Sequence, residues 1–87
     1  MVNEKNDFEN AVIAAKSLPD RPDNENMLLL YALYKQATSG DVNVAKPGFF
    51  DFVGVAKFEA WEKIRGTSRD DASSSYIKLV RKLGGAI

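Results

Sequence analysis

The residues best suited to bind a ligand lie in the stretch 27–38, where two tyrosines and a lysine fall on one side of a predicted helix. Tyr31 and Lys35 are four residues apart and Tyr34 is one turn from Tyr31, so the three side chains share a face. A phenol beside an ammonium on an otherwise apolar helix suits a ligand that is part hydrophobic and part phosphate, because the hydroxyl donates hydrogen bonds and the lysine supplies a point charge. The alternative interpretation is that these tyrosines, and Tyr76 further on, are core residues with satisfied hydroxyls.

The chain offers no group of residues typical of catalysis. It has no cysteine and no histidine, which excludes thiol nucleophiles, Cys/His zinc sites and every histidine-based triad. The pair Asp70 and Asp71 is better explained by stabilisation of a helix start than by general acid–base work. With 12 basic and 12 acidic residues the net charge is zero, which argues against nucleic acid as a partner. We therefore expect no enzyme activity, no metal and no cofactor.

Length and composition predict a single globular domain over residues 1–87. The chain has a mass of 9.6 kDa, and 45% of its residues are hydrophobic against 28% charged. Its first ten residues, MVNEKNDFEN, lack the apolar core of a secretory signal. The longest apolar run, Met27 to Tyr34, is far short of the roughly 18 residues that cross a bilayer. We expect a cytoplasmic monomer.

Hydrophobic spacing predicts four helices and no strand. The first covers about residues 7–18, with Asn6 as its N-cap, Glu9 completing a capping box and Pro19 as the stop. The second runs from near Asp23 to near Gly40, and the third from Asp51 to about Arg65. The fourth is capped by Ser68 and is expected to fray at Gly84-Gly85.

The second predicted helix is apolar almost all round. One stripe consists of Met27, Leu30, Tyr31 and Tyr34, and another of Leu29 and Leu33. A surface helix needs one stripe, so in so small a chain the extra apolar face is expected to line a groove, with core packing as the rival interpretation. The inner sides predicted for the third and fourth helices consist of Val53, Ala56, Ala60, Trp61 and Ile64, and of Ala72, Tyr76, Leu79, Val80 and Leu83.

The lengths of the connections bear on topology. The first and second helices are joined by a short link, as are the third and fourth, and short links favour antiparallel neighbours. The link over residues 40–51 is long enough to cross the bundle and leave the second and third helices parallel. The pattern predicts an all-α four-helix bundle, in which a long crossover is permitted but not required.

Several runs resemble the acyl-CoA-binding protein family over nearly the whole chain. They are MLLLYALYKQATSGDVN at 27–43, KPGFFDFVGVAK at 46–57, EAWEKIRGTS at 59–68 with Ala72, and Tyr76-Ile77. The order of YKQAT, GDVN, a proline–glycine turn and a tryptophan before GTS is highly specific. The resemblance implies an up-down-down-up four-helix bundle that holds one long-chain acyl-CoA ester without a covalent bond.

The resemblance also implies roles for particular residues. Tyr31 and Lys35 match groups that engage the 3′-phosphate and adenine of the coenzyme, and Lys57 matches a lysine that adds to the phosphate site. Tyr76 matches a tyrosine near the nucleotide. The positions that match the path of the acyl chain and pantetheine are Val12, Lys16, Met27, Leu28 and Tyr34.

The function implied is buffering and intracellular transport of medium- to long-chain acyl-CoA esters, with transient contact with acyl-CoA-using enzymes or membranes. Val53 and Val55 stand where the family commonly has lysine, which predicts weaker long-range attraction of the phosphates. The alternative from the residues alone is a helical protein-interaction module that docks a partner on the apolar face of the helix at 23–40.

Overall fold

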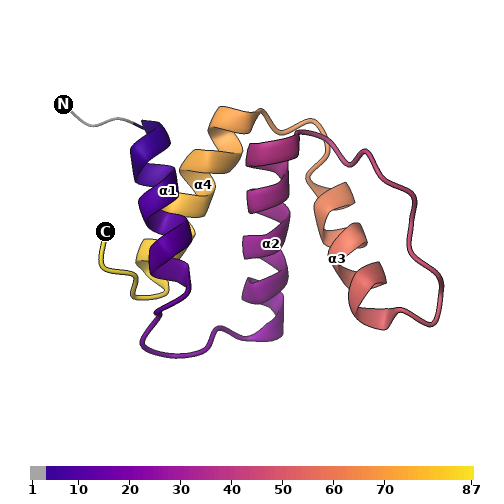
Figure 1. Cartoon of the computed structure of the whole chain (residues 1–87), viewed down its shortest axis with the longest axis horizontal. Helices are drawn as coiled ribbons and strands as arrows, with labels where there is room; N and C mark the ends of the chain where they lie inside the picture. Colours follow the sequence, from indigo (N-terminus) through magenta and orange to yellow (C-terminus); the bar gives the residue numbers. More distant parts are fainter. Residues whose placement is uncertain (1–3) are drawn as a thin grey trace.

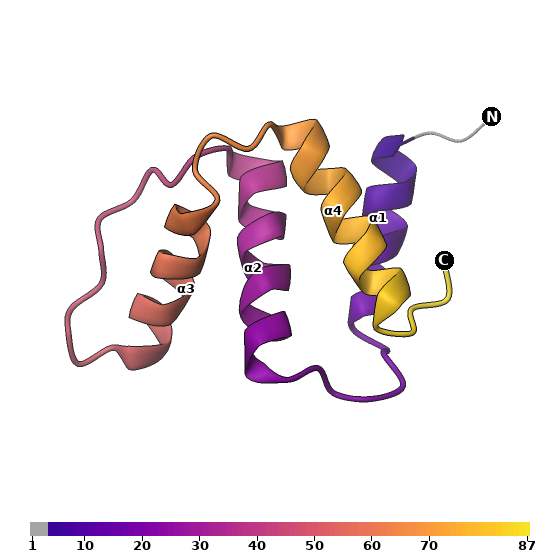
Figure 2. The same ribbon diagram turned by 180° about the vertical axis from the view of Figure 1, so that it is seen from behind.

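The computed structural model describes residues 4–87, and this part of the chain contains helices and no strand, so the all-α prediction is confirmed. The helices are α1 (Glu4–Ala15), α2 (Asn24–Ser39), α3 (Phe52–Lys63) and α4 (Arg69–Lys82). Figure 1 shows α1 and α2 running in opposite directions, and α2 and α3 in the same direction. The link between α2 and α3 travels back along the length of α3, and α4 then reverses the direction again, as the view from behind in Figure 2 also shows. This is the up-down-down-up order.

Three of the helix starts are capped by side chains, and two of these caps, Asp23 and Ser68, are predicted from the sequence. The carboxylate of Asp23 accepts a hydrogen bond from the Asn26 amide at 2.8 Å, and the Ser68 hydroxyl accepts one from the Asp71 amide at 3.0 Å. Asp51 caps α3 in the same way, on the Gly54 amide at 3.0 Å. Each bond satisfies a backbone donor that the first turn of a helix leaves without a partner.

The predicted limits of α1 are wrong at both ends. The helix begins at Glu4, so Asn6 lies inside it and is not its N-cap. It ends at Ala15, before Pro19, where the Lys16 amide donates to the Ile13 carbonyl at 3.1 Å and the Ser17 amide to the Ala14 carbonyl at 3.0 Å. These i→i−3 bonds tighten the last turn and end the helix three residues early.

The end of α4 is closed rather than frayed. Gly84 adopts a positive φ of 99°, which costs glycine little. This conformation allows the Gly84 amide to donate to the Arg81 carbonyl at 3.0 Å and the Gly85 amide to the Val80 carbonyl at 2.8 Å. The two bonds form a Schellman motif, which satisfies carbonyls at the helix terminus.

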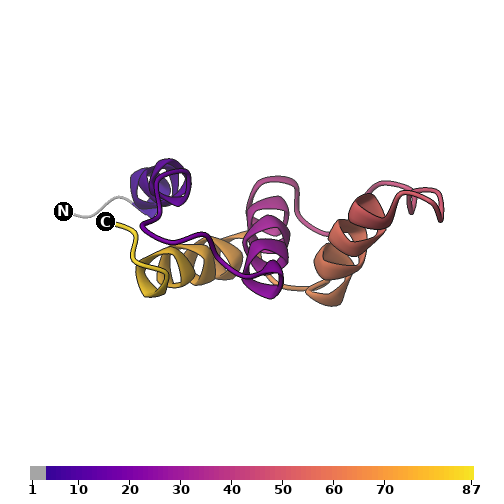
Figure 3. The ribbon, with the colours of Figure 1, turned by 90° about the horizontal axis from the view of Figure 1, so that it is seen from below.

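The helices pack as a row with one pair stacked. Close backbone contacts join α1 to α4, α4 to α2, and α2 to α3, so that α3 packs against α2 alone among the four described helices. Figure 3 shows α1 lying over α4 and α3 at the far end of the row. The main core joins α1, α2 and α4 and consists of Ala11, Leu30, Leu33, Ala72, Tyr76, Ile77, Leu79 and Val80. A smaller core between α2 and α3 consists of Ala32, Val42 and Trp61.

One predicted inner position of α3 is wrong. Val53 is 66% exposed, whereas Trp61 is only 2% exposed and is a core residue as predicted. Val53 lies in the first turn of α3, where its side chain lines a cavity between α2 and α3 instead of packing against α2.

The end of the molecule where α2 and α3 finish and α4 begins is held by a polar network. The buried Gln36 amide donates to the Asp41 carboxylate at 2.7 Å and to the Thr67 carbonyl at 2.8 Å. The same Asp41 oxygen accepts from the Gly66 amide at 2.7 Å. The bond from the Gly66 amide is the main cause that lowers the pKa of Asp41, and the Gln36 amide adds to it. We call this region, including Trp61, the closed end.

Candidate functional site

The first part of the site is a cleft between α1 and α2, which we call the α1–α2 cavity. Its volume is about 260 Å³. The cavity exists because α1 and α2 both pack against α4, whereas the backbones of α1 and α2 do not come close to each other. The cavity is lined by Val12, Ala15 and Lys16 from α1 and the residues just after it, by Met27, Leu30, Tyr31 and Tyr34 from α2, and by Tyr76 from α4.

The second part lies between α2 and α3, and we call it the α2–α3 cavity. Its volume is about 590 Å³, within the range of small-molecule pockets. The link between α1 and α2 contributes Arg21. The helices contribute Asn24, Met27, Leu28 and Tyr31 from α2, and Phe52, Val53, Ala56 and Lys57 from α3.

Met27 and Tyr31 line both cavities, so the two meet along the first half of α2. The predicted stripe of Met27, Leu30, Tyr31 and Tyr34 forms the α2 wall of the first cavity, although Leu30 also belongs to the main core. The charged side chains among the described lining residues are all basic: Lys16, Arg21 and Lys57. An apolar surface bordered only by cations suits an amphipathic anion.

Three aromatic rings form the part of the site nearest α4. The Phe8 ring lies 5.2 Å from the Tyr76 ring in an edge-on arrangement and 6.1 Å from the Tyr34 ring in a stacked one. Tyr76 is only 5% exposed. Burial, followed by the nearby Tyr34, raises the pKa of Tyr76. Its hydroxyl is therefore protonated at neutral pH and is able to donate a hydrogen bond.

Lys57 and Tyr31 form a pair on the α2–α3 cavity. The Lys57 Nζ atom lies 5.2 Å from the centre of the Tyr31 ring, within the range of a cation–π contact. The structure thus brings together two of the residues that the resemblance implies for the phosphate site.

Lys35 is the predicted site residue that the structure does not bring to either cavity. Its Nζ atom lies 5.0 Å from the centre of the Trp61 ring instead. The other eight of the nine predicted residues line one cavity or both. The sequence could not reveal this contact, because Trp61 is far from Lys35 along the chain and reaches it only through the packing of α3 on α2.

Arg21 and Phe52 line the α2–α3 cavity but were missed as site residues. A signal for Arg21 was present, because it is the only basic residue between Lys16 and Lys35. Phe52 was predicted to lie in the first turn of the third helix but was not assigned to the inner side of that helix.

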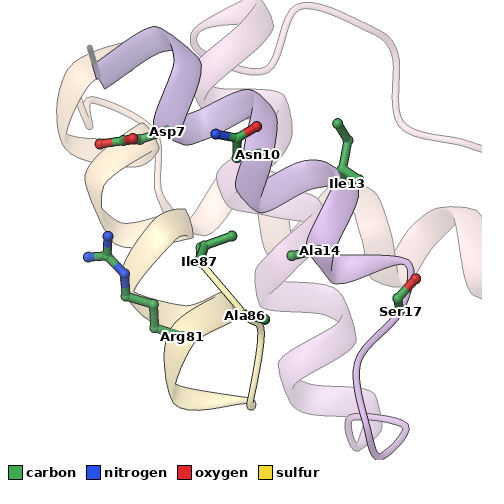
Figure 4. Close-up of a pocket in the computed structure, with 8 residues that line it drawn as sticks. All are labelled: Asp7, Asn10, Ile13, Ala14, Ser17, Arg81, Ala86 and Ile87. Carbon is green, nitrogen blue, oxygen red and sulfur yellow. The ribbon is translucent and has the colours of Figure 1, made fainter. Parts of the chain in front are cut away.

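Two further cavities adjoin α1. One of about 630 Å³ shares Val12 and Tyr34 with the α1–α2 cavity and extends past Phe8 toward Arg69. The other, of about 420 Å³, is formed where the chain after α4 returns toward α1; Figure 4 shows Asp7, Arg81 and Ile87 around it. None of the nine predicted site residues lines the cavity of Figure 4.

Residues 4–87 contain neither a metal site made of acidic side chains nor a helix that could span a membrane. This part of the chain has no group of three or more acidic side chains placed to hold a metal ion. None of its helices is long and apolar enough to span a membrane.

Comparison of the sequence with protein families matches residues 5–80 to the model described as Acyl CoA binding protein. Acyl-CoA-binding domain-containing protein 1 of Oryza sativa subsp. japonica is 51% identical over 77 residues, which are 88% of this chain and 85% of that protein. The Acyl-CoA-binding protein of Ricinus communis is 48% identical over 81 residues, 93% of this chain and 90% of the relative.

Solved structures give the same result for the fold. The crystal structure of Oryza sativa Acyl-CoA-Binding Protein 2 superposes with a TM-score of 0.89 at 42% identity and covers 93% of this chain and 90% of that one. The crystal structure of the protein called ACBP from Moniliophthora perniciosa gives a TM-score of 0.85 at 40% identity, with coverage of 91% and 78%.

Proposed function

Because this chain belongs to the acyl-CoA-binding protein family, we propose that it binds one long-chain acyl-CoA ester without chemical conversion, buffers it and carries it within the cell. The observation that carries the proposal is the meeting of two apolar cavities at Met27 and Tyr31, with only basic charged residues in their described lining. Such a surface accepts a hydrocarbon chain and a phosphorylated nucleotide at the same time.

The acyl chain supplies most of the binding energy in this proposal. Met27, Leu28, Phe52 and Ala56 offer it apolar surface in the α2–α3 cavity. Burial of roughly sixteen carbons yields at most about 12 kcal/mol, at about 0.8 kcal/mol per methylene. The ordering of the chain and the loss of overall ligand freedom offset a good part of this gain. The apolar contacts alone do not distinguish an acyl-CoA from a free fatty acid.

The phosphates supply the discrimination. Lys57 and Tyr31 lie together at the cavity. We expect Lys35, on the same face of α2 as Tyr31, to leave Trp61 and join them when a phosphate binds. A cation–π contact at a partly exposed site contributes about 0.5–1 kcal/mol, whereas a hydrogen bond to a charged group contributes about 1.5–3 kcal/mol. The phosphate is therefore the stronger partner for this ammonium.

Calorimetric titration of a long-chain acyl-CoA and of the matching free fatty acid tests the proposal. We expect saturable one-to-one binding of the thioester and much weaker binding of the acid. Lys57→Ala and Lys35→Ala should each weaken acyl-CoA binding about ten- to a hundred-fold. Lys78→Ala is the matched control, because Lys78 is an exposed lysine of α4 that lines neither cavity.

The outcomes separate the two lysines. Equal affinity for the thioester and the acid would contradict the proposed function. Unchanged affinity in Lys35→Ala alone would show that this lysine stays on Trp61, and Trp61 fluorescence, which should change when the ammonium departs, would then be insensitive to the ligand. The release of Lys35 is thus tested separately from ligand binding.

The protein-interaction module is not favoured, because most of the apolar residues of α2 belong to the core or line the cavities. Leu30 and Leu33 are core residues, and Met27 and Tyr31 line the cavities. For the protein as a whole we propose a cytoplasmic monomer that exchanges its ligand through transient contacts with acyl-CoA-using enzymes or membranes. Sedimentation analysis of the ligand-free and ligand-bound protein tests the monomeric state.

A further inference from the structure

The largest exposed apolar side chains of the described molecule gather at the link between α2 and α3 and the first turn of α3. Phe49, Phe50, Phe52 and Val53 are 76%, 82%, 72% and 66% exposed. We call these residues the phenylalanine patch. The Phe49 and Phe50 rings lie 4.6 Å apart. Soluble monomers rarely leave such a cluster in water, and a contiguous apolar patch marks a surface that contacts another apolar phase.

The phenylalanine patch is continuous with the proposed ligand site. Phe52 and Val53 line the α2–α3 cavity together with Arg21 and Lys57. The one acid within the segment, Asp51, accepts the hydrogen bond from the Gly54 amide that caps α3. The mouth of the cavity therefore presents aromatic rings bordered by basic side chains.

We propose that the phenylalanine patch inserts into the interface of an anionic lipid bilayer, so that the α2–α3 cavity opens directly onto the membrane and the acyl-CoA passes between the two by collision. This inference rests on the proposed function, and it names the surface that such an exchange uses. The rings would enter the region between headgroups and acyl chains, while Arg21 faces the anionic headgroups and Lys57 stays with the phosphate of the ligand.

The character of the patch favours a bilayer over a folded protein as the occupant. Phe49 and Phe50 carry no side-chain polar group, and the turn before them is open, since a Cβ atom on Gly48 would meet nothing within 4 Å. A protein partner would have to offer a pocket shaped for this protruding turn. A bilayer interface accepts apolar rings of any arrangement, and its anionic headgroups complement the neighbouring cations.

Direct exchange also removes an obstacle to ligand transfer. An acyl chain that crosses water between the protein and a membrane exposes all its methylenes on the way, and each exposed methylene slows the step. Passage from a cavity whose mouth lies within the interface avoids that exposure. The rate of transfer should then depend on encounters with the membrane rather than on release into water.

Cosedimentation of the ligand-free protein with phosphatidylcholine vesicles containing phosphatidylserine tests the surface. The variant Phe49→Ser/Phe50→Ser should lose about tenfold or more in vesicle affinity, because two rings no longer enter the interface. Ile13→Ser is the matched control, since Ile13 is 65% exposed on α1 outside the patch. Its vesicle affinity should equal that of the unmodified protein.

Transfer kinetics test the collision. The rate of transfer of a fluorescent acyl-CoA from the unmodified protein should rise with vesicle concentration, and the rate from the double variant should not. Either of two results would overturn the inference: vesicle binding by the double variant that equals that of the unmodified protein, or no vesicle binding by the unmodified protein. The second result would leave a protein partner as the occupant of the patch.

Failure of this inference is distinguishable from failure of the proposed function. Phe49 and Phe50 line neither cavity, so acyl-CoA affinity in solution should be the same for the double variant and the unmodified protein. The absence of acyl-CoA binding by the unmodified protein would contradict the proposed function, whereas the vesicle assay with ligand-free protein tests the phenylalanine patch by itself.

Discussion

The two ends of this small bundle differ in their interactions: one end is held by polar hydrogen bonds, and the other carries an apolar cavity. At the closed end, hydrogen bonds of 2.7–2.8 Å join Gln36, Asp41 and the turn at 66–67, and Trp61 donates to the Gly40 carbonyl at 2.9 Å. At the opposite end, which we call the open end, the link before α2 and the first turns of α2 and α3 lie together (Figure 1) and carry the α2–α3 cavity. Polar hydrogen bonds between helix ends lie at one end, and exposed apolar surface lies at the other.

This difference shows how a chain of 87 residues keeps both a fold and a groove. A domain of this size buries a modest share of its surface, so apolar side chains left in a groove reduce the core that stabilises it. Polar bonds between helix ends at the closed end compensate for apolar contacts missing at the open end. We therefore expect substitutions at the closed end to change stability and substitutions at the open end to change ligand affinity.

Removal of Trp61 should have the largest effect. Its side chain is 2% exposed and its Nε1 atom donates to the Gly40 carbonyl at 2.9 Å. Trp61→Ala should lower the free energy of unfolding by about 3–5 kcal/mol, measured by urea denaturation followed by circular dichroism. Trp61→Phe keeps a ring and loses the donor, so it should cost less, about 1–3 kcal/mol. An unchanged urea midpoint in Trp61→Ala would contradict the assignment of this residue as the support of α3.

Polar substitution of Met27 probes the open end. This side chain lines both cavities and is 42% exposed. Met27→Ser should weaken acyl-CoA binding by about tenfold through lost apolar contact, with the free energy of unfolding changed by about 0.5 kcal/mol or less. Met27→Leu conserves volume and should bind nearly as the unmodified protein does. Calorimetry measures the affinity of both variants and urea denaturation their stability. A large loss of stability in Met27→Ser with unchanged affinity would contradict the assignment of Met27 to the ligand site.

Loss of the charge of Asp41 should have a smaller effect, confined to stability. The pKa of Asp41 is lowered in the folded protein, chiefly by the Gly66 amide and then by the Gln36 amide. A lowered pKa stabilises the fold above the ordinary range of aspartate, and this contribution is lost as the pH falls through the folded value. Asp41→Asn should therefore lower the urea midpoint at neutral pH but not at strongly acidic pH. If Asp41→Asn still had the lower urea midpoint at strongly acidic pH, the loss would come from altered hydrogen-bond geometry and not from the missing charge.

The smallest effect should come from Tyr76 at alkaline pH. Burial and the neighbouring Tyr34 raise the pKa of Tyr76. A raised pKa contributes stability below the ordinary range of a phenol, about pH 10, and this contribution is lost as the pH rises through the folded value. Tyr76→Phe should unfold less readily than the unmodified protein as the pH rises in this range, although at neutral pH the two are similar. Thermal unfolding of both proteins at a series of alkaline pH values measures this difference. Unfolding temperatures that fall equally with pH in both proteins would contradict the raised pKa of Tyr76.

The sequence predicted the parts of the fold that depend on local chemistry. Asp23 and Ser68 cap helices as expected, because a cap needs only a side-chain acceptor two or three residues before a free amide. The same reasoning failed at Asn6. The good helix formers before it extend α1 through the apparent capping box, and a cap cannot be told from an interior residue by its type alone.

The parts that depend on neighbours were less predictable. The periodicity of α3 assigned Val53 to the inside, but burial also depends on how closely α2 approaches, and at Val53 the two helices leave the α2–α3 cavity. The position of Lys35 over Trp61 is of the same kind. The stripe from Met27 to Tyr34 was predicted successfully because all its members lie on one helix, whose own geometry aligns them.

The attachment of α3 through α2 alone has a consequence for the range of ligands. If the acyl chain lies in the α2–α3 cavity as proposed, a longer or bulkier chain would displace α3 against one interface, while α1 and α4 keep their places. The resistance to widening then grows gradually with chain length. We expect affinity measured across a series of acyl lengths to decline gradually beyond its optimum, because the cavity can widen. A rigid cavity of fixed length would instead exclude every chain above one length.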